Sequence, residues 1–171
     1  EILRCGTPQA APGCAVTVRY LYQVLRGLPK EIVFAQMLAG FELASRTDTQ
    51  VVGLNLVMPE DALVPMRDFS LHMRLLDYLH SVYPKVQVTL HAGELVPGLV
   101  PPEGLRFHIR ESIALGHATR IGHGVAVMQE DDAVGLLNAM ARNKIMVEIC
   151  LTSNTGILGV SGARHPLSAY L

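Results

Sequence analysis

Short apolar runs alternate with longer amphipathic segments along most of this chain. The run "VVGLNLV" (51–57) is continuously apolar, which is typical of a strand buried on both faces. The segment 29–46 repeats apolar residues, among them Val33, Met37 and Phe41, at helical spacing. Read in this way, the pattern predicts strands at 15–25, 51–57, 86–93, 118–125 and 145–154, and helices at 29–46, 66–84, within 101–116 and at 130–144.

The predicted order is strand, helix, strand, repeated to five strands with four intervening helices. This order indicates one parallel sheet with right-handed crossovers, and a spacing of roughly 30 residues suits βα units. No Gly-rich phosphate-binding turn follows the first strand, which disfavours a dinucleotide-binding sheet. A complete (β/α)8 barrel needs roughly 200 to 250 residues. The chain is therefore predicted to be an α/β protein, either an open five-stranded sheet or an incomplete TIM (β/α)8 barrel.

Composition narrows the functional classes. Half of the 171 residues are hydrophobic, 17% are charged, and the net charge is −1. A nearly neutral chain has no electrostatic footprint for nucleic acid or for a membrane surface. No apolar run reaches the ~18 residues of a membrane-spanning helix. The low charge suits strands that are buried on both faces, or a part of a larger body whose covering partner is absent.

The cysteines exclude one kind of metal site. Cys5, Cys14 and Cys150 form no C-x-x-C pair, so a zinc site built from cysteines is not expected. Cys5 and Cys14 flank a loop rich in Pro, Gly and Ala, where they could form a disulfide in an oxidising compartment or stay free. The compartment stays open, with the cytoplasm slightly favoured over the periplasm or secretion.

Polar side chains gather where the predicted strands end. His91 closes the third strand, with Glu94 just beyond it, and His123 closes the fourth strand between two glycines. The second strand runs into residues 55–60, and the fifth ends at 152–154. Because chemistry in α/β folds gathers at the carboxyl ends of parallel strands, these positions predict one shared site.

The residue types at these ends indicate metal chemistry. A single histidine at a strand end is about as often a core residue as a ligand, but His91, His123 and Glu94 together favour a site. Neutral imidazole is the commonest metal ligand and suits zinc. A carboxylate placed beyond such a ligand can pass a proton between a metal-bound water and a substrate.

The remaining histidines are expected to play no chemical role. His72 and His80 lie on a charged helix and should be solvated. His108 should be at the surface or in helix packing, and His117, before the fourth strand, reads as structural. His165 precedes a proline near the end of the chain and receives no assignment.

Three motifs together resemble one family. "LHAGE" (90–94), "RIGHG" (120–124) and "EICLTSN" (148–154) are similar, in order and spacing, to motifs of the adenosine/AMP deaminase family of metal-dependent amidohydrolases. The segments 16–26 and 51–56 match the two preceding strands of that family. The resemblance covers nearly the whole chain. It implies a (β/α)8 barrel with one Zn²⁺ that hydrolyses the 6-amino group of adenine-type purines, releasing ammonia.

The resemblance also implies a role for each matching residue. His91 would be a zinc ligand, and Glu94 would be the acid that protonates the purine ring nitrogen. His123 would not bind the metal but would hold the attacking hydroxide and stabilise the developing charge. Ser153 and Asn154 would fix the loop at their strand end. The substrate would be a purine nucleoside or a related small molecule.

Two family features are absent. No histidine precedes His72, so the H-x-H pair of the first barrel strand is missing, and the Asp-Asp pair after the eighth strand is missing as well. The chain then holds one of four expected zinc ligands and corresponds to roughly barrel strands 3 to 7. Residues 1–171 are expected to form a single incomplete catalytic domain, an internal fragment that is inactive alone, with the other barrel segments possibly on separate chains.

Position 58 departs from the family pattern. The family usually has Ala-Gly-Asp-Glu after this strand, whereas this chain has Met58 followed by Pro59. Met58 is therefore a substrate-binding candidate whose bulk puts adenosine itself in doubt as the substrate. Two alternatives stay open: a non-catalytic barrel module that binds a purine or a partner chain, and another amidohydrolase with a different leaving group.

Overall fold

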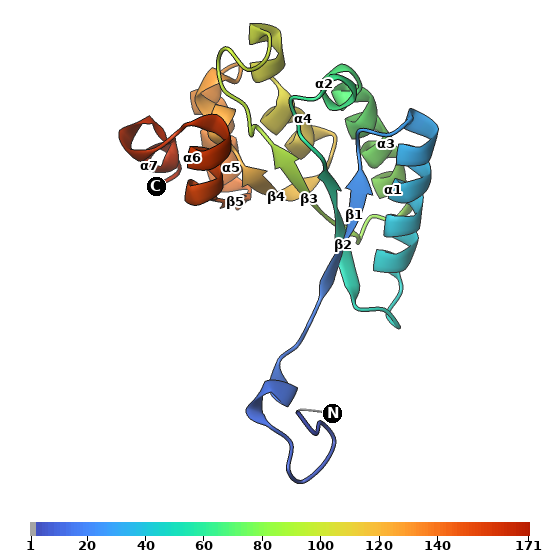
Figure 1. Cartoon of the computed structure of the whole chain (residues 1–171). Helices are drawn as coiled ribbons and strands as arrows, with labels where there is room; N and C mark the ends of the chain where they lie inside the picture. The colour runs from blue at the N-terminus through green and yellow to red at the C-terminus, as the bar shows by residue number, and fades with distance from the viewer. Residues whose placement is uncertain (1–2) are drawn as a thin grey trace.

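The computed structural model describes residues 3–171, and its centre is one sheet of five parallel strands in the order β1-β2-β3-β4-β5. The predicted alternation of five parallel strands with helices is confirmed (Figure 1). The strands are β1 (Tyr20–Leu25), β2 (Val51–Val57), β3 (Gln87–Ala92), β4 (Ala118–His123) and β5 (Met146–Glu148). The α-helices are α1 (Lys30–Ser45), α2 (Leu63–Arg67), α3 (Phe69–Val82), α4 (His108–Ala114), α5 (Ala133–Arg142), α6 (Leu151–Leu158) and α7 (Leu167–Tyr170). Short 3-10 helices are η1 (Pro12–Ala15), η2 (Pro102–Leu105), η3 (Val125–Gln129) and η4 (Gly162–Arg164).

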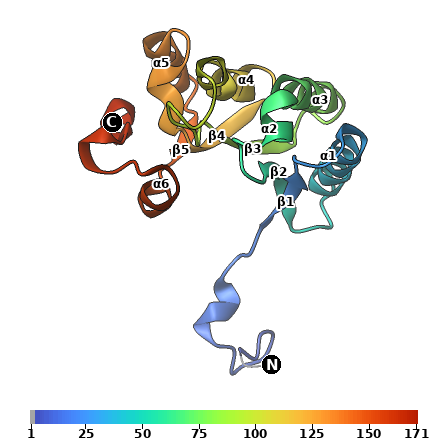
Figure 2. The same ribbon diagram turned by 45° about the horizontal axis from the view of Figure 1, so that its top comes forward.

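The crossover helices α1, α3, α4 and α5 lie in an arc along one face of the sheet (Figure 2). The core lies between them and the strands. Phe69, Met73, Leu76 and Leu79 share one face of α3, as their spacing predicts, and all four are buried. Each buried side chain of this size stabilises the fold by about 1.5–3 kcal/mol, so this face fixes the crossover against the sheet.

The amino-terminal segment departs from the predicted first strand. Pairing begins only at Tyr20, which lies opposite Val51, and the preceding residues run away from the sheet (Figure 1). Because β2 starts at Val51, an earlier residue has no neighbouring strand with which to pair its backbone groups. Within this amino-terminal segment, Cys5 and Cys14 form a disulfide.

The fifth predicted strand is wrong in its second half. Strand β5 ends at Glu148, and residues 151–158 form helix α6, so Thr152, Ser153 and Asn154 lie on a helix rather than at a strand end. A short apolar run bounded by small polar residues has no period that separates strand from helix. No helix within residues 3–171 combines the length and the apolar character that a bilayer span requires.

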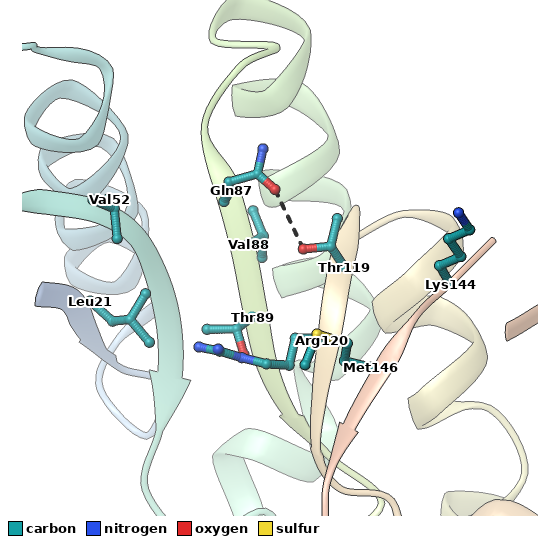
Figure 3. Close-up of a pocket in the computed structure, with 9 residues that line it drawn as sticks. All are labelled: Leu21, Val52, Gln87, Val88, Thr89, Thr119, Arg120, Lys144 and Met146. Carbon is teal, nitrogen blue, oxygen red and sulfur yellow. Dashed lines mark hydrogen bonds between the residues drawn. The ribbon is translucent and has the colours of Figure 1, made fainter. Parts of the chain in front are cut away.

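A cavity of about 380 Å³ lies near the amino ends of the strands, the opposite end from His91. Figure 3 shows Arg120 reaching across β3 toward Thr89, whose hydroxyl oxygen accepts from the guanidinium Nε at 3.3 Å. The Nε atom of Arg120 also pairs with Glu148 at 3.0 Å. The Arg120 guanidinium thus already has two partners, and the walls of this cavity do not include His91, His123 or Glu94.

Candidate active site

Strands β3 and β4 bring the two candidate histidines together. Ala92 lies opposite His123 in the ladder, so His91 and His123 occupy neighbouring strand ends, and their ring centroids are 4.9 Å apart. Glu94 follows the turn at Gly93, and one of its carboxylate oxygens lies 3.1 Å from Nδ1 of His123. The structure therefore places all three predicted residues at one edge of the sheet.

The turn between His91 and Glu94 requires glycine. Gly93 has φ of 73°, in the left-handed region, and a Cβ there would lie 2.8 Å from Cδ1 of Ile109. A side chain would thus meet both backbone strain and a buried neighbour. The turn brings the Glu94 carboxyl back over the strand ends, toward His123 and Ser153.

His91 is held by Asn55 on the adjacent strand. The backbone N–H of His91 donates to Oδ1 of Asn55 at 3.2 Å, and the same oxygen lies 3.3 Å from the ring Nδ1. The amide Nδ2 of Asn55 lies 2.9 Å from that ring nitrogen. Burial, with the imidazole of His123 and the charge of Arg26 nearby, lowers the pKa of His91 to about 4. The imidazole is therefore neutral near pH 7, the form that binds metals.

Glu94 lies in an environment that favours its neutral form. Burial raises the pKa of the Glu94 carboxyl, and the negative charge of Glu60 adds to the shift, while His123 opposes it. The Ser153 hydroxyl donates to the same oxygen that faces His123, at 3.4 Å. A carboxyl with a raised pKa keeps its proton to higher pH, as a general acid must.

A second, fully buried carboxylate fixes the backbone of this turn. Glu60 is 2% exposed, and its two oxygens accept the N–H groups of Gly93 at 2.9 Å and Glu94 at 2.8 Å. Nδ1 of His108 lies 2.6 Å from the first of these oxygens. Burial alone would raise the pKa of Glu60, but the hydrogen bond from His108 and the charge of Arg26 together bring it below its ordinary value.

Arg26 completes this buried group at the end of β1. Its guanidinium donates to the carbonyl oxygens of Met58, at 3.2 and 3.1 Å, and of His91, at 3.1 Å. The side chain is 2% exposed, so its charge is compensated within the protein, chiefly by Glu60. Arg26 thus ties the ends of β1, β2 and β3 together beneath the site.

Two residues of the site have left-handed backbones although they are not glycine. Met58 has φ of 89° and His123 has φ of 68°. Such conformations cost about 1–3 kcal/mol each and persist where surrounding structure holds them, often at functional sites. The Sδ atom of Met58 accepts the N–H of Gly27 at 3.3 Å.

A cavity of about 330 Å³ opens beside these residues. Its walls combine polar groups of the site with apolar side chains from the loop after β3 and from α6. They include Met58, Glu60, His91, Glu94, Leu99 and Ile157. A pocket of this size, with a few convergent polar groups, can enclose a small heterocycle.

Comparison with known proteins identifies the family to which the chain belongs. The model of the family described as adenosine deaminase matches residues 1–171, which is the whole chain. The chain belongs to the adenosine deaminase family. An adenosine deaminase of Mycolicibacterium vanbaalenii is 32% identical over 166 residues, which are 92% of this chain and 41% of that protein. An adenosine deaminase of Mycobacterium leprae is 32% identical over 167 residues, with the same shares. The chain spans about two fifths of the length of these relatives.

A solved structure shows the same fold. The crystal structure of an adenine deaminase from Arthrobacter aurescens matches 86% of this chain and 39% of that protein, with a TM-score of 0.59 and 21% identity. Together with the five parallel strands, this likeness identifies the sheet as part of a TIM barrel. The fold class predicted from the sequence is confirmed, and the family resemblance with it.

Residues 3–171 fit only part of a zinc site. His91 fits a zinc ligand, because its ring is neutral near pH 7 and the Asn55 amide, which lies 2.9 to 3.3 Å from Nδ1, fixes the orientation of the ring. Within residues 3–171, however, no three His, Cys, Asp or Glu side chains converge as a metal cluster. Three protein ligands are the usual minimum for catalytic zinc. Residues 3–171 thus supply one candidate zinc ligand rather than a complete set of ligands.

The prediction for His72 is wrong, and His165, which received no assignment, is buried as well. His72 is 1% exposed and not solvated, because the buried face of α3 includes it. His165 is 4% exposed, and its Nε2 hydrogen-bonds to Asn154. His108 is buried and bonded to Glu60. His117, as expected, is structural and pairs with Asp77 on α3 at 2.7 Å.

Sequence reasoning missed several residues around the site. Glu60 and Arg26 are buried, and Asn154 lies against His123 rather than only fixing a loop. A charged residue between apolar runs signals such burial only weakly, since most charged residues are exposed. The signal that could have found His165 is its place directly before a proline, close to the small polar residues of α6.

Proposed function

We propose that the protein containing this chain is a hydrolase that deaminates adenosine or a related 6-aminopurine. The observation that carries the proposal is the convergence of His91, Glu94 and His123 at one edge of the sheet, in a chain of the adenosine deaminase family. The relatives named adenosine deaminase and the likeness to an adenine deaminase support an adenine-type substrate. The reaction adds the oxygen of water to the ring carbon, breaks the C–N bond and releases ammonia.

Each of the three residues has a distinct part in this proposal. The protonated Glu94 carboxyl donates its proton to a ring nitrogen of the substrate, which makes the adjacent carbon easier to attack. His123 donates a hydrogen bond to the oxygen that attacks this carbon, and it stabilises the charge that develops. Met58 contacts the substrate from the wall of the cavity, where its bulk limits what the substrate can carry at that side.

His91 would hold a Zn²⁺ ion together with ligands from outside these 171 residues. A bound zinc ion supplies hydroxide near neutral pH, because it lowers the pKa of water to about 7. Residues 1–171 would then form one incomplete catalytic barrel domain, and this chain would be inactive until the other barrel segments, in the same or separate chains, are present. The single candidate ligand and the share of the relatives that the chain covers support this view.

The proposal is tested on the natural polypeptide that carries these residues. Zinc content is measured by elemental analysis, and ammonia release is measured with adenosine, AMP and adenine. One zinc ion per complete site and ammonia from at least one of these substrates are expected. A polypeptide that binds no zinc and releases no ammonia would contradict the proposal and would leave the non-catalytic alternative.

Replacing His91 tests the metal role directly. His91→Gln is expected to lower zinc affinity by at least about 100-fold, since loss of even an outer-shell partner of a ligand costs 10–100-fold. Zinc affinity is measured by competition with a chelator. His80→Gln, on α3 and outside the site, is the matched control and should bind zinc as the unaltered protein does. Equal affinities in the two variants would remove His91 from the ligand set.

A further inference from the structure

Three buried side chains form a continuous hydrogen-bonded series behind the site. The backbone N–H of Leu167 donates to Nδ1 of His165 at 3.1 Å. Nε2 of His165 lies 3.1 Å from Oδ1 of Asn154, and Nδ2 of Asn154 lies 3.0 Å from Nδ1 of His123. Asn154, His165 and His123 are 0%, 4% and 6% exposed. The series joins the loop before α7 to the end of β4 through the buried amide on α6.

The direction of every hydrogen bond in this series follows from its first donor. A backbone N–H can only donate, so Nδ1 of His165 must be an acceptor and the ring must carry its proton on Nε2. That Nε2–H donates to Oδ1 of Asn154, which fixes the orientation of the amide. The amide Nδ2 then donates to Nδ1 of His123. A flipped amide would leave Nε2 of His165 facing an N–H donor with no lone pair to accept it.

We infer that Asn154 and His165 are positioning residues that hold His123 in the tautomer with its proton on Nε2. Nδ1 of His123 is occupied as an acceptor, so the ring presents an N–H donor from its other side. This inference rests on the proposed function for its catalytic meaning, because a donor at Nε2 is what the attacking oxygen requires of His123. The tautomer itself follows from the hydrogen-bonded series alone.

The same arrangement acts on Glu94. Its carboxyl oxygen lies 3.1 Å from Nδ1 of His123, and the only other group facing that oxygen among the described hydrogen bonds is the Ser153 hydroxyl. In this tautomer Nδ1 of His123 carries no proton and its one lone pair is engaged by Asn154, so an ionised Glu94 carboxylate would face it with no proton between them. Asn154 thereby also disfavours the ionised form of Glu94.

Asn154→Asp is the most direct test, because it keeps the size of the side chain and replaces the donating amide by an acceptor. His123 should then carry its proton on Nδ1, or on both nitrogens. Asn138→Asp, at an exposed position of α5, is the matched control. The readout is the set of imidazole ¹⁵N chemical shifts in the ring-labelled natural polypeptide, which distinguish the two neutral tautomers and the cation.

The expected result is Nε2–H for His123 in the unaltered protein and in N138D, and a changed form in N154D. Nδ1–H in the unaltered protein, or an unchanged tautomer in N154D, would overturn the inference. If N154D does not fold, the pair His165→Gln and His165→Leu decides: glutamine can still donate to Asn154 and should preserve the tautomer, whereas leucine cannot and should yield a mixture. Equal spectra for these two variants would likewise overturn it.

Kinetics separate this inference from the proposed function. In an active protein, N154D is expected to lower kcat by about 10²-fold or more with little change in KM, since the wrong tautomer of a catalytic histidine costs up to about 10⁴-fold. A protein with the expected tautomer and no deaminase activity would contradict the proposed function alone. Full activity in N154D despite a changed tautomer would overturn the catalytic meaning assigned to Asn154.

Discussion

Glu94→Gln is expected to lower kcat for deamination by about 10²- to 10⁴-fold, the usual contribution of a positioned general acid. Glutamine keeps the shape of the side chain and its contact with Ser153, but it has no proton of comparable acidity to give to the substrate ring. Substrate binding should change little, because the lost interaction belongs to the transition state. Ammonia release at saturating substrate is the measurement.

The contribution of Glu94 to kcat should also depend on pH. Burial raises the pKa of Glu94, so the active, protonated carboxyl persists to higher pH than in an ordinary glutamate. The Glu94-dependent part of kcat should be present below the raised pKa and should fall as pH increases through it, whereas E94Q should lack that limb. Glu103→Gln, at an exposed position of η2, is the control. An E94Q enzyme as fast as E103Q would exclude Glu94 as the acid.

Glu60→Gln is expected to destabilise the folded protein by about 3–5 kcal/mol, because it leaves the buried guanidinium of Arg26 without its main compensating charge. Glutamine also places an N–H₂ group against donors, since both oxygens of Glu60 accept backbone N–H groups, those of Gly93 and Glu94. Urea unfolding of the natural polypeptide at pH 7 measures the loss. Asp61→Asn, at the exposed neighbouring position, should change the free energy of unfolding by less than about 0.5 kcal/mol.

Low pH should reproduce this loss in the unaltered protein. The pKa of Glu60 is lower in the folded state than in the unfolded chain, so its stabilising contribution is complete above the unfolded pKa and disappears as pH falls through the folded value. The unaltered protein should therefore lose more stability than E60Q between neutral and acidic pH. Parallel pH curves for the two proteins would show that Glu60 is not the charge that holds Arg26.

Periodicity predicted the elements that follow local rules. The helix face of Phe69 and Met73 and the buried strand 51–57 were predictable because burial on one face repeats every three or four residues, and burial on both faces gives a continuous apolar run. The position of His91 and His123 at strand ends followed from the same reading. The end of β5 did not, because the segment after Glu148 has no period that distinguishes a strand from the helix α6.

The polar contacts of the site could not be predicted from the sequence. Asn154 meets His123 across 31 positions, and Glu60 meets Gly93 across 33. Nothing local to either residue specifies such a partner, since the contact depends on how several crossovers pack. For the same reason His72, which was expected to be solvated on a charged helix, is buried.

By itself the sequence determined the alternation of strands and helices, the order of His91, Glu94 and His123 at neighbouring strand ends, and the family motifs that contain them. These features depend on local hydrophobic periodicity and on the rule that parallel strands end at one edge of a sheet. Only the tertiary structure decided which groups are buried, which carboxylate holds the turn, and which hydrogen-bond partners the rings of His123 and His165 face. Those outcomes depend on desolvation and on hydrogen-bond direction, and both exist only once distant segments are packed together.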